Sequence, residues 1–372
     1  MDFYFVYSSG GGAGDWNGIN RTWKDFMPFY FKNNLLIKFG DIFFNHKGLN
    51  RLTKPQLWNN VSNGRTWLIE RTGDTSLETT SNLIMDVGTT KIVNYIACHY
   101  STLSPEEVIE KFDEILEEEL ILNKYADFVL ESNISNAVTF DIPNPFKIRN
   151  QTGNTARNIF TDTNCRKLLI NKCLQYANHT YSRLGDANRL LVLIPSFLNE
   201  NEIEPYLSNL DFTPQKIAIG ALIGLNESDF VSALAKMSNN LNLSEYSKVH
   251  FLGCGGLKKA NLIKNTLGNH SNFSVDNTTA FNRSIDGNKK GSSQSCYYDY
   301  DEKSEIRIKP STKDDILRLH ARTNVKLFSD AEMEVIIDSV LDHQSNRSSQ
   351  ETYDNRAKLA IHNTDVFRYN AL

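Results

Sequence analysis

Two aspartates in this sequence end short apolar runs, where an enzyme built on a parallel sheet keeps its reactive groups. Asp86 follows the run 83–85, and Asp276 follows the run 273–275 just before a polar, basic turn. The strand ends of barrel enzymes carry catalytic residues, and pairs of carboxylic acids break glycosidic bonds. The two acids therefore suggest glycosidic-bond chemistry, with Asp276 in the place of a nucleophile. Taken alone, either one could equally cap a following helix.

The elements that must position these acids are predicted from nine apolar runs. The expected strands are Phe3–Tyr7, Leu35–Phe39, Leu83–Met85, Phe128–Leu130, Ala137–Phe140, Leu190–Ile194, Lys216–Ile219, Val249–Leu252 and Phe273–Val275. From residue 190 onwards the starts lie roughly 30 residues apart, the length of one strand-helix-strand unit. This spacing predicts an α/β fold, a (β/α)8 TIM-type barrel with a small C-terminal helical subdomain. A doubly wound open sheet is the alternative, but nucleotide-binding fingerprints are missing.

Helix signals and a change of composition divide the chain. Ser104-Pro105-Glu106-Glu107 combines an N-cap, a proline at the first helical position and a capping-box glutamate. After residue 283 the chain becomes polar before helical segments at 314–327 and 330–343, and the stretch 344–372 is expected to be partly disordered. We expect a barrel over 1–290 and a C-terminal extension over 291–372.

Composition limits the class of protein. The 372 residues are 40% hydrophobic with a net charge of -4, so the chain can bury a large core and a nucleic-acid partner needs a local basic surface. Five cysteines without a CxxC pair argue against a disulfide framework and favour a reducing cytoplasm. Neither a signal peptide nor a membrane span is expected. The oligomeric state is not predictable.

Several segments, taken in order over residues 80 to 325, resemble the barrel motifs of the tRNA-guanine transglycosylase superfamily. They are Asn82 to Gly88, Thr139 to Pro145, Ala218 to Gly224, His250 to Gly255, and Asp276 followed by Thr279 and Arg283. The resemblance implies that Asp276 is the nucleophile and Asp86 the general acid and base. It also implies that the base is bound by Asp141, Gly220, Gly224 and Gly253. Asp141, before Ile142-Pro143, could instead hold an Asx turn.

The sequence departs from that family at its zinc motif. Cys296 and His320 have the family's separation, but Gly291 and Ser293 stand where other ligands belong. Two ligands do not make a closed tetrahedral site, so we expect no metal. Because the zinc subdomain helps those enzymes to grip tRNA, the better resemblance is to the branch that modifies DNA with a 7-deazaguanine (DpdA), found in phages and bacterial gene clusters. A phage-encoded member would act in the host cytoplasm.

The resemblance implies an enzyme, a pentosyltransferase that exchanges guanine in DNA for a 7-deazaguanine such as 7-cyano-7-deazaguanine without a cofactor. The alternatives are a tRNA-guanine transglycosylase without zinc, a non-catalytic transglycosylase-like binding subunit, and a sugar hydrolase. Phosphate contacts are expected from Arg283, Lys258, Lys259, Lys289 and Lys290, although lysines in such clusters are more often a solvated face. The glycine-rich stretch 8–14 lacks P-loop spacing and is expected to form a loop at the rim.

Overall fold

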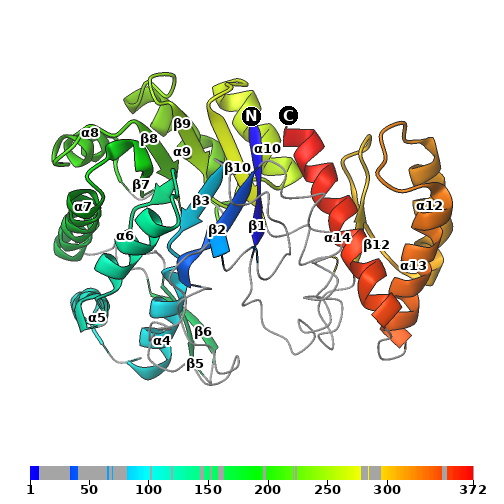
Figure 1. Cartoon of the computed structure of the whole chain (residues 1–372), viewed down its shortest axis with the longest axis horizontal. Helices are drawn as coiled ribbons and strands as arrows, with labels where there is room; N and C mark the ends of the chain where they lie inside the picture. Colours follow the sequence, from blue (N-terminus) through cyan, green and yellow to red (C-terminus); the bar gives the residue numbers. More distant parts are fainter. Residues whose placement is uncertain are drawn as a thin grey trace.

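The computed structural model describes most of the chain. The described residues are 1–7, 34–40, 65, 66, 69, 82–100, 103–118, 120–142, 146–150, 153–157, 163–195, 198–220, 222, 224–277, 284, 295–345 and 350–371. Figure 1 shows a barrel with helices around it and a helical segment beside it at the C-terminal end of the chain.

Eight parallel strands close into a barrel, in the order β1-β10-β9-β8-β7-β4-β3-β2. The strands are β1 (Asp2–Tyr7), β2 (Leu35–Lys38), β3 (Leu83–Asp86), β4 (Ala137–Val138), β7 (Leu190–Ile194), β8 (Lys216–Ile219), β9 (Lys248–Phe251) and β10 (Phe273–Asn277). Each strand is hydrogen-bonded on both sides, so the sheet has no exposed edge. The predicted (β/α)8 barrel is confirmed.

Helices cover the outer face of the barrel (Figure 1). They are α4 (Thr90–His99), α5 (Pro105–Glu118), α6 (Ile121–Glu131), α7 (Thr163–Leu184), α8 (Glu200–Ser208), α9 (Glu227–Asn240) and α10 (Leu257–Leu267), with the 3-10 turn η2 (Ala187–Arg189) before β7. An antiparallel hairpin of β5 (Phe146–Asn150) and β6 (Gly153–Arg157) follows β4 and contacts α4.

Local signals explain which predicted elements are correct. The capping box at the start of α5 is present, with Ser104 N–H donating to Glu107 Oε2 at 2.6 Å and Glu107 N–H to Ser104 Oγ at 3.3 Å. The predicted strand 128–130 is wrong, because these residues belong to α6. Buried side chains recur there at positions 121, 125, 128 and 129, the spacing of a helix face.

The strands alternate between two cores. Outward-facing residues pack against the helices, and the inward-facing apolar cluster consists of Tyr4, Val6, Leu36, Ile84, Val138, Leu191, Leu193 and Ala218. At the amino ends of the strands, Lys216 Nζ donates to Ser135 O at 2.9 Å and to Asn188 O at 2.7 Å. The ammonium of Lys216 is thus hydrogen-bonded at the amino ends of the strands. The predicted acids lie at the opposite, carboxyl ends of the strands.

The C-terminal segment forms β11 (Cys296–Tyr298), β12 (Glu305–Arg307), η3 (Pro310–Thr312), α12 (Lys313–Arg322), α13 (Asp330–Ser345) and α14 (Gln350–Ala371). A separate small core joins these elements, including Tyr297, Ile316, Met333, Ile337 and Leu359. The expectation of partial disorder over 344–372 is wrong for residues 350–371, which form the 22-residue helix α14. Its polar sequence conceals a buried face, because asparagine, histidine and aspartate side chains of α14 are hydrogen-bonded to β11 and to the residues after it.

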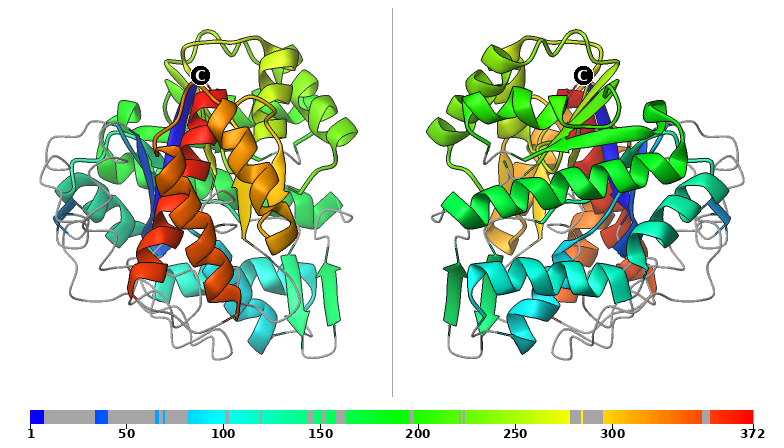
Figure 2. Two further views of the ribbon diagram at one scale, coloured as in Figure 1. Left: turned by 90° about the vertical axis from the view of Figure 1, so that its right-hand side faces the viewer. Right: turned by 90° about the vertical axis from the view of Figure 1, so that its left-hand side faces the viewer.

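Helix α14 returns to the barrel, where it packs against β1 and α10 (Figure 2). Phe367 is buried and meets Tyr298 edge-on at 4.8 Å between ring centroids, and Lys264 Nζ of α10 donates to Asn370 O at 3.0 Å. Among the helices that the structure describes, none is both long and apolar enough to cross a membrane.

Phe367→Ala should lower the free energy of unfolding by about 3–5 kcal/mol, because it leaves a cavity between α14 and the barrel. Urea unfolding followed by circular dichroism measures this change. The control is Glu351→Ala on the exposed first turn of the same helix, for which we expect a change within about 0.5 kcal/mol. Equal stabilities of the two variants would show that α14 is not docked.

Candidate functional site

Asp276 lies in β10 and is held by donors from the adjacent strand and its loop. Its Oδ1 accepts a hydrogen bond from Gly253 N–H at 2.6 Å and lies 3.1 Å from Nε2 of His250. The side chain is 9% exposed. Among the described residues, no hydrogen bond is made to Oδ2. One oxygen is therefore fixed, and the other is left for a ligand.

Two glycines after β9 make this arrangement possible. Gly253 has a φ of +71°, in the left-handed region that favours glycine. Gly255 N–H donates to the main-chain oxygen of Asp276 at 2.8 Å. A Cβ at Gly255 would lie 2.8 Å from Phe3 Cε2 and 3.0 Å from the Asp276 carbonyl. The glycine-rich turn thus packs directly on Asp276. Gly253, which was predicted to bind the purine base, donates its N–H to the Asp276 carboxylate.

Asp86 ends β3 and is paired in register with Lys38 of β2. Its carboxyl accepts hydrogen bonds from the main-chain N–H groups of Gly88 and Val87. Burial is the main cause that raises the pKa of Asp86; Lys38 acts against it, and the charge of Asp276 adds to it. Asp86 and Asp276 are therefore close enough to influence each other across the mouth of the barrel.

Asp141 follows β4 at the same mouth. Thr89 Oγ1, at the start of α4, donates to Asp141 Oδ1 at 3.3 Å. Burial, with a smaller contribution from the charge of Asp86, raises the pKa of Asp141 to about 7. Asp86 thus interacts with both other acids, and the three predicted carboxyl groups share one site.

Buried tyrosines on the outer helices are hydrogen-bonded to three strands of the barrel, two of which lead to these acids. Tyr125 of α6 donates to Val138 O at 2.7 Å and to Met85 O at 3.2 Å, and so joins β4 to the residue before Asp86. Tyr206 of α8 donates to Leu193 O at 3.1 Å in β7. Each hydroxyl satisfies carbonyl groups in a region where water has no access.

The two remaining predicted base-binding glycines differ in their surroundings. Gly220 follows β8, and a Cβ there would lie 2.9 Å from Leu193 Cδ1, so any side chain at this position would force Leu193 to shift. Nothing lies within 4 Å of a Cβ built on Gly224. Packing accounts for Gly220, whereas the space beside Gly224 leaves room for a larger group.

The predicted basic residues are only partly described. Lys258 is 74% exposed and pairs with Glu227 at 2.5 Å. Lys259 Nζ donates to Leu222 O at 2.7 Å and lies 4.9 Å from the centre of the Phe230 ring, so its ammonium holds the loop after β8. Arg283, Lys289 and Lys290, and the glycine-rich stretch 8–14, lie outside the described residues.

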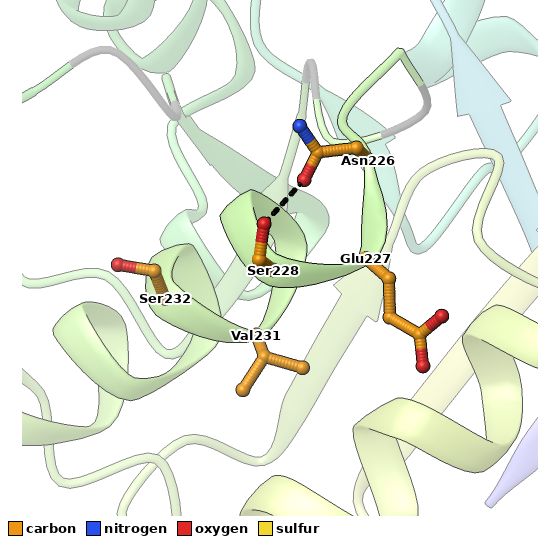
Figure 3. Close-up of a pocket in the computed structure, with 5 residues that line it drawn as sticks. All are labelled: Asn226, Glu227, Ser228, Val231 and Ser232. Carbon is orange, nitrogen blue, oxygen red and sulfur yellow. Dashed lines mark hydrogen bonds between the residues drawn. The ribbon is translucent and has the colours of Figure 1, made fainter.

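A shallow depression at the start of α9 is lined by Asn226, Glu227, Ser228, Val231 and Ser232 (Figure 3). Asn226 Oδ1 accepts hydrogen bonds there from Ser228 Oγ at 2.8 Å and from Asp229 N–H at 2.9 Å. These are the contacts of a helix cap. Helix capping explains the polar residues of the depression without a ligand.

The two residues at the family's zinc positions contact other protein groups. Cys296 Sγ lies 3.2 Å from Glu305 Oε1. His320 Nε2 lies 2.9 Å from Phe328 O, and its Nδ1 lies 3.3 Å from the Tyr297 hydroxyl. Within the described part of the chain, no three His, Cys, Asp or Glu side chains are grouped to hold a metal ion.

Two residues of the site were not predicted to take part in it. His250 was named only as part of the segment 250–255, with no role of its own, and Lys38 was treated only as part of a strand. The alternation of strand residues was the available signal. Every second side chain of a strand faces the same side of the sheet. Lys248, His250 and Leu252 therefore share one side, and Leu36 and Lys38 share one side of their strand.

The fold and the site together define a parallel (β/α)8 barrel with a carboxylate-lined mouth. No protein-family model matches the chain, and no curated protein matches it.

Asp141→Asn should raise the free energy of unfolding above that of the parent at pH 8, and this difference should be smaller at pH 5. The pKa of Asp141 is raised to about 7 from 3.8, so the parent gains stability as the pH falls through 7 and has gained it all below about 4. The asparagine variant has no such charge to bury, and we expect it to be about 1–3 kcal/mol more stable at pH 8.

Urea unfolding of the Asp141 variant and the parent at pH 5, 6, 7 and 8 measures this difference. Asp127→Asn, on the exposed surface of α6, is the control for the same chemical change. A difference between parent and Asp141→Asn that stays constant with pH would contradict the raised pKa.

Proposed function

We propose that the chain is a guanine transglycosylase that replaces guanine in DNA with a 7-deazaguanine, such as 7-cyano-7-deazaguanine. The observation that supports this most is the meeting of Asp86, Asp141 and Asp276 at one barrel mouth in three different settings. Asp276 is oriented by two groups, Asp86 is partly buried near a lysine, and Asp141 is partly buried beside a hydroxyl. A base exchange needs three such functions: a nucleophile, a proton carrier and a base-binding acid.

In the first step the free oxygen of Asp276 attacks C1′ of the target nucleotide. The C1′–N9 bond breaks, and its electrons leave with guanine, which takes a proton from Asp86. The raised pKa of Asp86 suits this role, because an acid with an ordinary pKa would be ionised at neutral pH and would have no proton to give. The product is a covalent ester between Asp276 and the sugar.

In the second step the incoming deazaguanine loses its N9 proton to Asp86 and attacks C1′. The new C1′–N9 bond forms as the C1′–oxygen bond to Asp276 breaks, and the electrons return to the carboxylate. Two inversions at one carbon retain the configuration. Asp86 loses a proton in the first step and gains one in the second, so the enzyme ends unchanged.

Asp141 recognises the base in this scheme. A carboxylate accepts hydrogen bonds from the N1–H and the exocyclic amine of guanine, a pair of donors that adenine lacks. In the empty site the pKa of Asp141 is about 7. Two donors from a bound guanine would stabilise the ionised form, so binding of the base is expected to weaken as the pH falls below 7.

The choice of DNA rests on the sequence, since Cys296 and His320 remain from a zinc motif whose other positions are changed. The target guanine must leave the base stack to reach a barrel mouth, at a cost of a few kcal/mol. In this proposal phosphate is contacted by Lys258, which is exposed at the start of α10, and by Arg283, Lys289 and Lys290.

Asp276→Asn tests the proposal. The parent should transfer labelled 7-deazaguanine into duplex DNA and form an adduct that survives denaturation, while the variant should lose more than about a thousandfold in rate, because it lacks the nucleophile. Scintillation counting of recovered DNA and tRNA measures the exchange. Asp127→Asn on the outer helices is the matched control and should keep the parent's rate.

Other outcomes would replace the proposal. Label entering tRNA alone identifies the zinc-free tRNA enzyme, and release of guanine without replacement identifies a hydrolase. Nucleic-acid binding that is unchanged in Asp276→Asn, with no exchange in the parent, identifies a binding subunit.

Lys38→Met should move the falling limb of the pH profile of kcat/KM to higher pH. Lys38 lowers the pKa of Asp86, so its removal keeps Asp86 protonated, and able to give its proton to the leaving guanine, to a higher pH. The rate of the variant relative to the parent should therefore be higher at pH 8 than at pH 6. Lys167→Met, exposed on α7, removes the same charge away from the site and should leave the profile unchanged.

A further inference from the structure

A column of polar and aromatic side chains lies inside the barrel beneath Asp276. Lys248 Nζ donates to the Tyr4 hydroxyl at 2.6 Å, and the Tyr4 ring meets the ring of His250 at 81° with 5.5 Å between centroids. His250 is fully buried, with Nδ1 2.9 Å from Ser274 Oγ and Nε2 3.1 Å from Asp276 Oδ1. Both ring nitrogens and one ring edge are therefore fixed.

The neighbours of His250 select one tautomer of the neutral ring. Asp276 Oδ1 is an acceptor, so a bare Nε2 would set two lone pairs against each other at 3.1 Å. The Ser274 hydroxyl can donate to Nδ1 at 2.9 Å, whereas its other contact, Val249 O, is longer at 3.4 Å. The arrangement favours Ser274 O–H donating to Nδ1 and Nε2–H donating to Asp276.

We infer that His250 is a positioning residue for the Asp276 nucleophile, an inference that rests on the proposed function. Together with Gly253 N–H, it holds Oδ1 so that Oδ2 faces the sugar. In the ester intermediate Oδ1 becomes the carbonyl oxygen. When the deazaguanine forms the C1′–N9 bond and the C1′–Oδ2 bond breaks, the electron pair returns to a carboxylate that both donors stabilise.

This role differs from that of a filler of the barrel interior. A ring of similar size would fill the space against Tyr4 but could not donate to Asp276. A glutamine, whose amide N–H can reach a similar place, would restore the donor without the ring. Loss of the donor should slow the chemical steps and leave the binding of the base unaffected, because Oδ1 does not contact the base in the scheme.

Kinetics of His250→Phe and His250→Gln test the inference. For His250→Phe we expect kcat for base exchange to fall by about a hundredfold to a thousandfold with KM within about threefold of the parent. His250→Gln should recover about a tenth or more of the parent's kcat. Tyr4→Phe, which keeps the ring and removes only the hydroxyl that accepts from Lys248, is the control from the same column and should retain kcat within about threefold.

A kcat of His250→Phe equal to that of the parent overturns the inference, as does a loss of kcat in Tyr4→Phe as large as in His250→Phe. Absence of base exchange in the parent, on DNA and on tRNA, is a different result and overturns the proposed function instead.

The contact between His250 and Asp276 can also be tested in a protein that shows no base exchange. Nitrogen-15 NMR of histidine-labelled protein, with His250 assigned by comparison with His250→Gln, reports the tautomer of the ring. We expect the Nε2–H form in the parent and a changed Nε2 shift in Asp276→Asn. The Nδ1–H form, or no response to Asp276→Asn, overturns the positioning contact whether or not the protein exchanges bases.

Discussion

The site depends on the burial of several carboxyl groups at one end of a barrel. A buried carboxylate is costly unless it is hydrogen-bonded or paired, and three of them also repel one another. Each acid meets this cost differently: Asp276 with a main-chain N–H and a histidine, Asp86 with two N–H groups and a lysine, and Asp141 with a threonine hydroxyl and a raised pKa. These different solutions give three identical side chains three chemical characters.

Strand register keeps these partners in place. Parallel pairing sets Lys38 beside Asp86 and Tyr4 beside Asp276. Because side chains alternate along a strand, a slip by one residue would turn Asp276 out towards the helices and bring Val275 or Asn277 into the mouth. The apolar residues that pack on the outer faces of the strands therefore help to determine the position of the acids.

Sequence patterns predicted the barrel and its acids because both leave local signals. The repeat of strand and helix lengths indicated a parallel sheet, and Asp86 and Asp276 stand where apolar runs stop. The segment 128–130 shows the limit of that reasoning, because three apolar residues in a row suit a strand and a buried helix face equally. His250 and Lys38 were missed because their meaning depends on which side of a strand faces inwards, and that is set by packing.

The last helix was misjudged for a related reason. Its polar composition predicted partial disorder, but Asn363 donates through Nδ2 to Ser284 Oγ and to Cys296 O, both at 2.7 Å, and His362 Nε2 lies 2.9 Å from Tyr298 O. These side chains are buried because the C-terminal segment offers them partners, and a pattern of hydrophobicity contains no record of partners.

The position of α14 also bears on the site. In the closed barrel β10, with Asp276, and β3, with Asp86, are separated on one side by β1 and β2. The helix that covers β1 is α14, from the far end of the chain. By packing on β1, α14 also stabilises the surroundings of Asp276, because Tyr4 of β1 is paired with Asp276 and packs against His250. The separation of the two acids across the mouth therefore depends on packing by a helix that begins 74 positions beyond Asp276, the nearer acid in the sequence.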